Sequence, residues 1–332
     1  MTHADQRPAL SLTNRLEGAL LGVHAGDALG ATLEFMSWEA IRSRYPEGLR
    51  EIVGGGRFGW PAGHATDDTD LTRAVLLAYL HAGPGQDVVR AAADNMLAWL
   101  DGQWPGREPG SRPADIGGAT RAGLERYRRG RDPRAAGAGP GQAGNGSLMR
   151  TIPTALAVPG RRRRISESIE ISAITHDDER AVTACAAYNE IAAALAAGLA
   201  PGASVAAGLA TARELGSDQV AGAIAAGQRI SPPALAAAGD LPFAGGAAGY
   251  VLDSLTLAVA AVLDQRPLAD VLVDIARLGN DADTNAAIAG GLLGARDGAA
   301  AIPRRWTRQL QFGSEFASAA AELAARRPAP VV

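Results

Sequence analysis

Lysine does not occur in this chain: all 32 basic residues among its 332 residues are arginines. A chain without lysine cannot form a Schiff base with a carbonyl substrate, and it cannot hold a nucleotide phosphate with the lysine of a P-loop. Both classes of enzyme are therefore excluded. The abundance of alanine, glycine and arginine beside this absence indicates a biased genome composition.

Cysteine occurs once, at Cys185, so the chain forms neither an internal disulfide nor a cysteine-based zinc site. The five histidines are scattered and include no His-x-x-x-His pair, which argues against a histidine zinc site. Residues 1–10 are charged and lack the apolar segment of a signal peptide. The uncharged stretch 191–212 is broken by Pro201 and too weakly apolar to span a membrane. We therefore expect a cytoplasmic protein with no membrane partner.

The charge balance is close to neutral, with a net charge of -3 and 20% charged residues. This composition is typical of a globular protein and provides no general attraction for nucleic acid, so a nucleic-acid partner is not expected. It indicates no particular oligomeric state. The basic run Arg161–Arg164 contains no aromatic residues, and we interpret it as a solvated loop.

Aromatic residues make up only 5% of the chain, and alternating β-branched runs are nearly missing, so a sheet of any size is not expected. Apolar residues instead recur at spacings of three and four, the pattern of amphipathic helices. The sequence therefore predicts an all-α, many-helix globule, with helices over residues 16–34, 71–82, 88–100, 166–175, 180–197, 251–263 and 268–278.

Glycine recurs every four residues in the first predicted helix, at Gly18, Gly22, Gly26 and Gly30. The charged residues in the same segment exclude a helix pair inside a membrane. The repeat predicts a central helix that neighbouring backbones approach closely, and residues 289–295 are a second segment of this kind.

Two acidic clusters, at residues 66–70 and 280–285, each stand directly before an apolar helical segment. Helix capping accounts for one Asp or Thr at each helix start, but it does not account for three acids in four residues, which repel one another. Mg²⁺, Mn²⁺ and Ca²⁺ bind carboxylate and hydroxyl oxygens and would offset that repulsion. The clusters therefore predict a metal site.

The second cluster begins like a calcium EF-hand loop, but Ala286 and Leu292 stand where that loop needs Gly and Glu. The remaining arrangement is one site built from both clusters, which suits a pair of cations that hold water. Such a shared site makes the chain one functional unit. No nucleophile constellation is convincing, so attack by a metal-held water is expected.

A glycine-rich segment at residues 139–147 contains a formal G-x-G-x-x-G. As a dinucleotide fingerprint it is weak, because an arginine-rich segment and not a strand precedes it. A glycine-rich turn that opens a helix near Leu148 still offers backbone N–H groups to a phosphate. Beside a metal cleft, this segment predicts a ligand that contains phosphate.

In this order and spacing, the motifs of the chain resemble those of the ADP-ribosylglycohydrolase family. The motifs are residues 18–31 with Glu34, and residues 66–69, 115–117, 144–150, 175–176, 249–253 and 281–284. The resemblance implies a compact orthogonal multi-helix globule with a two-cation Mg²⁺ or Mn²⁺ site. It also implies a single domain over residues 14–325, between an N-terminal extension (1–13) and a Pro-rich tail (326–332).

The same resemblance implies a role for each site residue. Glu34 would lie beside the metals and gate the site or position water, and Asp115 would be the general acid or base. The metal ligands would be Thr66, Asp67, Asp68, Asp281, Asp283 and Thr284. The substrate would be bound by Gly141, Gln142, Ala143, Gly144, Asn145, Gly146, Ser147, His176 and Tyr250.

The implied reaction is hydrolysis of the glycosidic bond between ADP-ribose and a modified acceptor, such as an arginine or serine side chain of a protein or a small molecule, with release of ADP-ribose. Two alternatives are a non-catalytic relative that binds ADP-ribose and a metal-dependent phosphohydrolase of a nucleotide diphosphate. Two positions depart from the family pattern: Asn280 replaces a usual Gly, and Gly118 replaces a common Asn. Neither departure removes a metal ligand.

Overall fold

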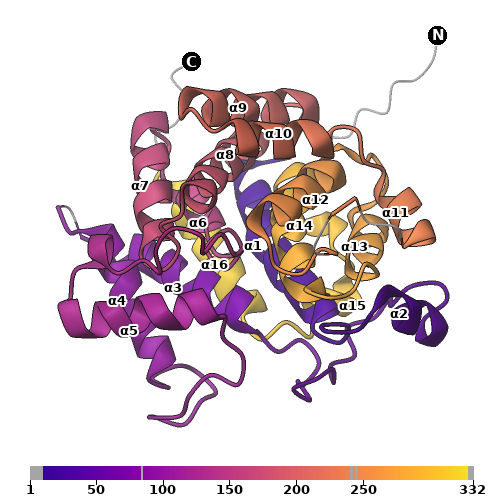
Figure 1. Cartoon of the computed structure of the whole chain (residues 1–332), viewed down its shortest axis with the longest axis horizontal. Helices are drawn as coiled ribbons and strands as arrows, with labels where there is room; N and C mark the ends of the chain where they lie inside the picture. Colours follow the sequence, from indigo (N-terminus) through magenta and orange to yellow (C-terminus); the bar gives the residue numbers. More distant parts are fainter. Residues whose placement is uncertain (1–9, 84, 240–241, 244–245, 328–332) are drawn as a thin grey trace.

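The structure is a computed structural model that describes residues 10–83, 85–239, 242–243 and 246–327. These residues form helices and two isolated antiparallel bridges, Gly55 with Trp60 and Gly144 with Tyr250, and include no strand. The predicted all-α class is therefore confirmed (Figure 1). The helices of the described residues are α1 (Leu12–Gly30), α2 (Trp38–Arg44), α3 (Asp67–His81), α4 (Val88–Leu100), α5 (Gly118–Gly130), η1 (Pro133–Ala135), α6 (Ile152–Ala157), α7 (Arg161–Ala173), α8 (Glu179–Ala196), α9 (Pro201–Glu214), α10 (Asp218–Gly227), α11 (Pro232–Ala238), α12 (Val251–Leu263), α13 (Leu268–Ala276), α14 (Ala282–Asp297), η2 (Ala299–Ala301), α15 (Arg304–Thr307) and α16 (Gly313–Ala325).

The predicted helices are all present, and those at 88–100 and 251–263 have the predicted bounds. Helix α1 begins earlier than predicted because the Ser11 hydroxyl caps it, accepting a hydrogen bond of 3.2 Å from the Asn14 N–H. It also ends at Gly30, four residues before Glu34. Of the expected N-terminal extension, residues 1–9 lie outside the described residues. None of the helices in the described part of the chain combines the length and hydropathy that a membrane span requires.

The glycine repeat of α1 packs against α14, as the sequence predicts. The backbone at Gly18 contacts that at Gly294, and Gly22 contacts Gly290, so a Cβ added at any of these four positions would overlap a carbonyl of the other helix. Further along, Gly26 faces Ala286 and Gly30 faces Asp283. Along these contacts the residue numbers rise in α1 and fall in α14, so the two helices are antiparallel. We call this contact the glycine seam.

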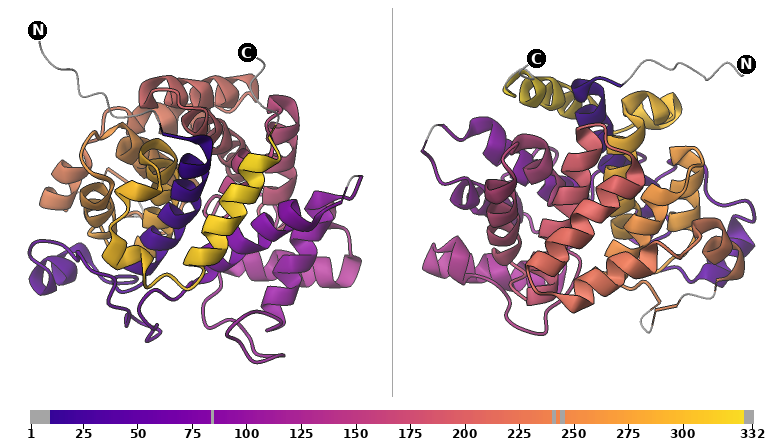
Figure 2. Two further views of the ribbon diagram at one scale, coloured as in Figure 1. Left: turned by 180° about the vertical axis from the view of Figure 1, so that it is seen from behind. Right: turned by 90° about the horizontal axis from the view of Figure 1, so that it is seen from above.

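The other helices surround the seam. Figure 2 shows α16 beside α1 on the side opposite that of Figure 1, and α1 contacts both α16 and α14. Helices α12 and α13 pack on α14, and α8 contacts α7 and α9 (Figure 1). Of the expected tail, Arg326 and Arg327 are described, and they donate hydrogen bonds to carbonyls at the ends of α3 and α6, among them those of Tyr79 and Leu156. Residues 328–332 lie outside the described residues.

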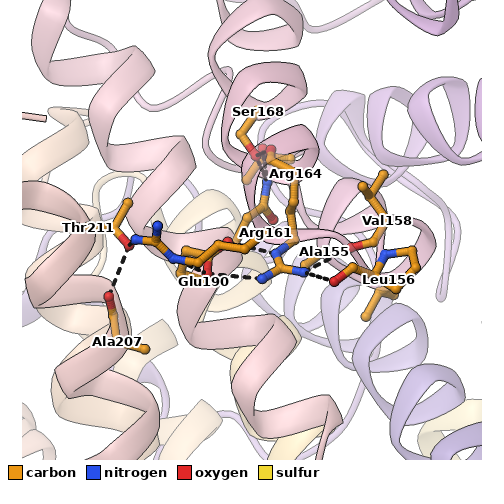
Figure 3. Close-up of polar contacts among 12 residues, drawn as sticks. Ala155, Leu156, Val158, Arg161, Arg164, Ser168, Glu190, Ala207 and Thr211 are labelled. Carbon is orange, nitrogen blue, oxygen red and sulfur yellow. Dashed lines mark hydrogen bonds and ion pairs between the residues drawn. The ribbon is translucent and has the colours of Figure 1, made fainter. Parts of the chain in front are cut away.

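The expectation of a solvated loop at Arg161–Arg164 is wrong, because these residues form the first turn of α7. The first three are exposed, but Arg164 is buried and donates from Nε and Nη2 to the buried Glu190 carboxylate of α8, at 2.7 and 2.9 Å (Figure 3). Its Nη1 donates to the carbonyls of Val158 and Pro159. Arg164, the last residue of the run, therefore belongs to an ion pair in the core, and its acidic partner lies on another helix.

The glycine seam predicts how substitutions in helical glycines act. Gly22→Ala places a methyl group against the Gly290 carbonyl, so it should lower the free energy of unfolding by about 3 kcal/mol, the upper part of the range for overpacking. Gly222→Ala in α10, which points into open space, should instead raise it by about 0.5–1 kcal/mol. Urea unfolding of both variants measures the difference. Equal stability of the two variants would contradict the close backbone contact at the glycine seam.

The buried ion pair gives a second matched comparison. Glu190→Ala leaves the Arg164 guanidinium buried without its carboxylate, and it should cost about 3–5 kcal/mol of unfolding free energy. Glu214→Ala removes an exposed partner of Arg161, in an ion pair that solvent screens, and should cost far less than Glu190→Ala. Thermal unfolding at one pH and ionic strength tests this ranking, and similar losses in both variants would disprove it.

Candidate active site

A cleft of about 820 Å³ opens at the end of α1, where the starts of α3, α5 and α14 approach one another. Its volume lies within the range of small-molecule sites. The expected site residues that line it are Glu34, Asp67, Asp115, Gly141, Gln142, Ala143, Gly144, Asn145, Gly146, His176, Tyr250, Asp281, Asp283 and Thr284. Thr66, Asp68 and Ser147 are buried and do not line it.

The two acidic clusters meet at Asp68. Its Oδ2 accepts hydrogen bonds from the hydroxyls of Thr66 at 3.3 Å and Thr284 at 3.2 Å, although Thr284 lies 216 residues further along the chain. Thr66 is the N-cap of α3, and Asp281 is the N-cap of α14. The starts of two helices therefore converge on one carboxylate-rich corner.

Three carboxylates of this corner crowd together: Glu34, Asp115 and Asp283 each offer an oxygen within 4.8 Å of the others. Burial, followed by the charge of neighbouring acids such as Asp115, raises the pKa of Glu34 to about 9. The same two causes hold the pKa of Asp67 and of Asp283 well above the usual range. The folded protein therefore disfavours the ionised form of these three side chains.

These carboxylates fit a cation. Within the described residues, Glu34 Oε2, Asp68 Oδ1 and Asp283 Oδ1 are buried and have no hydrogen-bond donor. A buried acceptor without a donor costs free energy, and hard divalent cations bind oxygen ligands of this kind. Asp70, the remaining acid of the first cluster, is different, because the indole N–H groups of Trp99 and Trp104 each donate to it at 2.8 Å.

Asp27, in the last turns of α1, is a positioning residue that the sequence argument did not assign to the site. Its Oδ2 accepts hydrogen bonds from the backbone N–H groups of Thr66 at 3.1 Å and Thr69 at 3.2 Å, and also from the Thr69 hydroxyl. Burial raises the pKa of Asp27 to about 6, against these hydrogen bonds. The sequence did carry a signal for this role, because Asp27 is an acid inside the mostly apolar glycine repeat. Asp27 ties α1 to the ligand-bearing start of α3.

The glycine-rich loop also lines the cleft. The N–H groups of Gly139 and Gly141 already donate to the carboxylates of Asp177 and Asp178, at 2.7 and 2.8 Å. Those of Gly144 and Gly146 have no acceptor among the described residues, and both glycines line the cleft. No strand precedes the loop, and the helix expected near Leu148 begins at Ile152 as α6.

A buried polar cluster supports this loop from behind. The Ser147 hydroxyl accepts a hydrogen bond of 2.8 Å from Ser172, so this expected substrate residue faces the core. Arg150 is completely buried and donates to the Gly146 carbonyl and to Thr175 Oγ1. Burial lowers the pKa of Arg150 to about 10, which leaves it charged. Arg150 therefore places positive charge beneath the loop. The sequence argument included it in a motif but assigned it no role.

Asn145, His176 and Tyr250 also line the cleft. Burial lowers the pKa of His176 to about 3, so its imidazole is neutral. The Asn145 amide donates to Asp281 Oδ2 at 2.6 Å, which joins the loop to the second acidic cluster. The guanidinium carbon of Arg180 lies 5.7 Å from the Tyr250 ring centroid, and the guanidinium group forms an ion pair with Asp178. The sequence argument did not assign Arg180 to the site.

The chain belongs to the ADP-ribosylglycohydrolase family, because the family model of that description matches residues 8–330. It is 32% identical over 324 residues to the ADP-ribosylarginine hydrolase Tri1 of Pseudomonas putida (strain GB-1), covering 95% of this chain and 79% of the relative. It is 30% identical over 310 residues to the ADP-ribosyl-(dinitrogen reductase) glycohydrolase of Rhodospirillum rubrum, covering 92% and 93%.

A solved structure described as an ADP-ribosylglycohydrolase-related protein complex shares the fold, with a TM-score of 0.77 and 29% identity over 95% of this chain and 98% of that chain. The resemblance inferred from the motifs is thereby confirmed, together with the compact multi-helix fold. The family consists of glycosidic-bond hydrolases, and the chain is an enzyme of that class.

The raised carboxylate pKa values predict a pH dependence of stability in the cation-free protein. The pKa of Glu34 is 4.5 in the unfolded chain and about 9 when folded, so the folded state binds more protons between these values. Its free energy of unfolding should therefore fall as pH rises through this window. Millimolar Mg²⁺ or Mn²⁺ should reduce that loss. Thermal unfolding from pH 6 to 9, with chelator or with cation, tests the prediction, and a stability that rises with pH in chelator would refute it.

Proposed function

We propose that this enzyme hydrolyses the N-glycosidic bond between the ribose of ADP-ribose and a guanidinium nitrogen of a modified arginine, with the help of divalent cations. The observation that carries the proposal is the pairing, in one cleft, of a carboxylate cluster with a glycine loop that has free N–H groups. The names of the two relatives support an ADP-ribosylated protein as the substrate, and that of the Pseudomonas relative supports arginine as the acceptor. Because the cleft draws on helices from α1 to α14, we also propose that residues 14–325 form one functional domain.

The cations would be two Mg²⁺ or Mn²⁺ ions. Such ions, when bound, supply positive charge that polarises ribose hydroxyls and makes water a better nucleophile at neutral pH. The unpartnered oxygens of Asp68 and Asp283 support this assignment, as does the meeting of the two clusters at Asp68. The residues that would hold the ions are Thr66, Asp67, Asp68, Asp281, Asp283 and Thr284.

The glycine loop would bind the diphosphate. The N–H groups of Gly144 and Gly146 are free to donate, and the buried charge of Arg150 favours an anion there. Asn145, His176 and Tyr250 line the neighbouring wall and would contact the ribose and adenine. These contacts would hold the anomeric carbon of the ribose toward the carboxylates.

The carboxylates at the rim would move the protons. In the proposed reaction a water oxygen bonds to the anomeric carbon while the bond from that carbon to the guanidinium nitrogen breaks. Asp115 accepts the proton of the water and then returns it to the departing guanidine, which leaves as a guanidinium and regenerates the carboxylate. Asp115 suits this task because it is only partly buried, whereas Glu34 is buried beside it and would hold the water in place.

An assay with a defined substrate tests this function. With Mg²⁺, the protein should release intact ADP-ribose from a peptide ADP-ribosylated on arginine, and a chelator should abolish the release. Asp283→Ala should lower kcat/KM by on the order of 100-fold, because it removes a proposed cation ligand. Asp270→Asn, at an exposed ion pair with Arg50, is the control and should leave activity unchanged.

The products separate the competing functions. Release of AMP would identify a phosphohydrolase. Tight binding of ADP-ribose without turnover of any linkage would identify a non-catalytic relative. Release from serine-linked but not arginine-linked peptides would overturn the proposed acceptor, and full activity in chelator would overturn the dependence on cations.

A further inference from the structure

Phe35 is an exposed aromatic side chain at the rim of the cleft, directly after Glu34. The residue is 59% exposed, although large apolar residues are usually buried. Its φ is +60°, in the left-handed region that bulky side chains rarely adopt. Backbone strain of this kind persists where the surrounding structure enforces it, and it is concentrated at functional sites.

Two hydrogen bonds enforce this conformation. The Phe35 N–H donates to the Asn280 carbonyl at 2.7 Å, and the Asn280 N–H donates to the Met36 carbonyl at 2.9 Å. Asn280 also has a positive φ, of +54°, and immediately precedes the ligand candidate Asp281. The segment after α1 is thus fastened to the start of α14 in a way that presents the Phe35 ring to the cleft.

The neighbours of the ring show what it can bind. The guanidinium carbon of Arg57 lies 5.6 Å from the Phe35 ring centroid, within the range of a cation–π contact. The Phe58 ring meets Phe35 edge-on, with centroids 6.2 Å apart, and leaves much of it exposed. Phe35 lines the same cleft as Glu34 and Asp115, so a group lying on its ring is next to the proposed reaction centre.

We propose that the exposed ring of Phe35 is the platform on which the guanidinium of the modified arginine lies while its bond to ribose is cleaved. Phe35 is then a specificity-determining residue for the acceptor side of the substrate. The inference rests on the proposed function, since it assumes an arginine acceptor. Arg57 shows that a guanidinium group is accepted on this ring.

Two substitutions at one position test the platform. Phe35→Leu keeps the apolar bulk but removes the aromatic face, and Phe35→Trp keeps that face. With an arginine-linked ADP-ribosyl peptide and Mg²⁺, Phe35→Leu should raise KM about fivefold with kcat changed less than twofold, as expected from a lost cation–π contact. Phe35→Trp should retain the wild-type KM. Calorimetry with free ADP-ribose should give the same Kd for all three proteins.

Other outcomes overturn the inference. An unchanged KM in Phe35→Leu would show that the ring does not bind the acceptor. A parallel rise in the Kd for free ADP-ribose would place the ring against the nucleotide, and an equal KM rise in Phe35→Trp would indicate a requirement of shape alone. If the wild-type protein fails to cleave the arginine-linked peptide, the proposed function itself has failed.

Discussion

The backbone contact between α1 and α14 is the constraint on which the rest of the structure depends. Each glycine in the middle of a helix costs about 1 kcal/mol relative to alanine, and α1 contains three such glycines at intervals of four residues before it ends at a fourth, Gly30. That cost is offset only if the two backbones come close enough to pack tightly along their length. The seam ends where Gly30 meets Asp283, at the edge of the cleft. It therefore fixes how far the segment that bears Glu34 lies from the start of α14.

The same constraint explains why the acids are crowded. Two helix starts and the end of α1 converge, and the packed seam leaves them little freedom to move apart. Asp27 uses its carboxylate to hold the start of α3 in place, so it does not relieve the crowding. Protonation or a bound cation are the remaining ways to balance the charge of Asp68 and Asp283. Folding, protonation and cation binding are thus coupled through one corner of the molecule.

Local patterns in the sequence predicted what depends on local physics. Apolar periodicity gave the exact bounds of helices 88–100 and 251–263, and the two acidic clusters before helix starts identified the residues that meet at Asp68. Two features that depend on distant partners, without a motif to mark them, were not predicted. The core position of Arg164 is set by Glu190, on another helix. Likewise, the inward orientation of Ser147 is set by Ser172.

The C-terminal end of α1 is another feature that the local sequence pattern did not predict. The apolar pattern continues to Glu34, so periodicity alone extends the helix by four residues. The helix stops at Gly30 because the following segment is bonded to Asn280, near the other end of the chain. Placing Glu34 in a turn and not in a helix allows its side chain to enter the cleft beside Asp115.

Asn280 shows how a residue other than Gly is accommodated in the turn before the second acidic cluster. The position needs a positive φ, which Gly adopts freely and Asn tolerates better than most residues. The Asn side chain then adds a contact that Gly lacks, a hydrogen bond of 2.5 Å from its amide to the Gly246 carbonyl. Further along this segment, the Gly249 carbonyl accepts from the Asn145 N–H in the glycine loop. Asn280 therefore forms the turn before the acidic cluster and links it to the segment that binds the glycine loop.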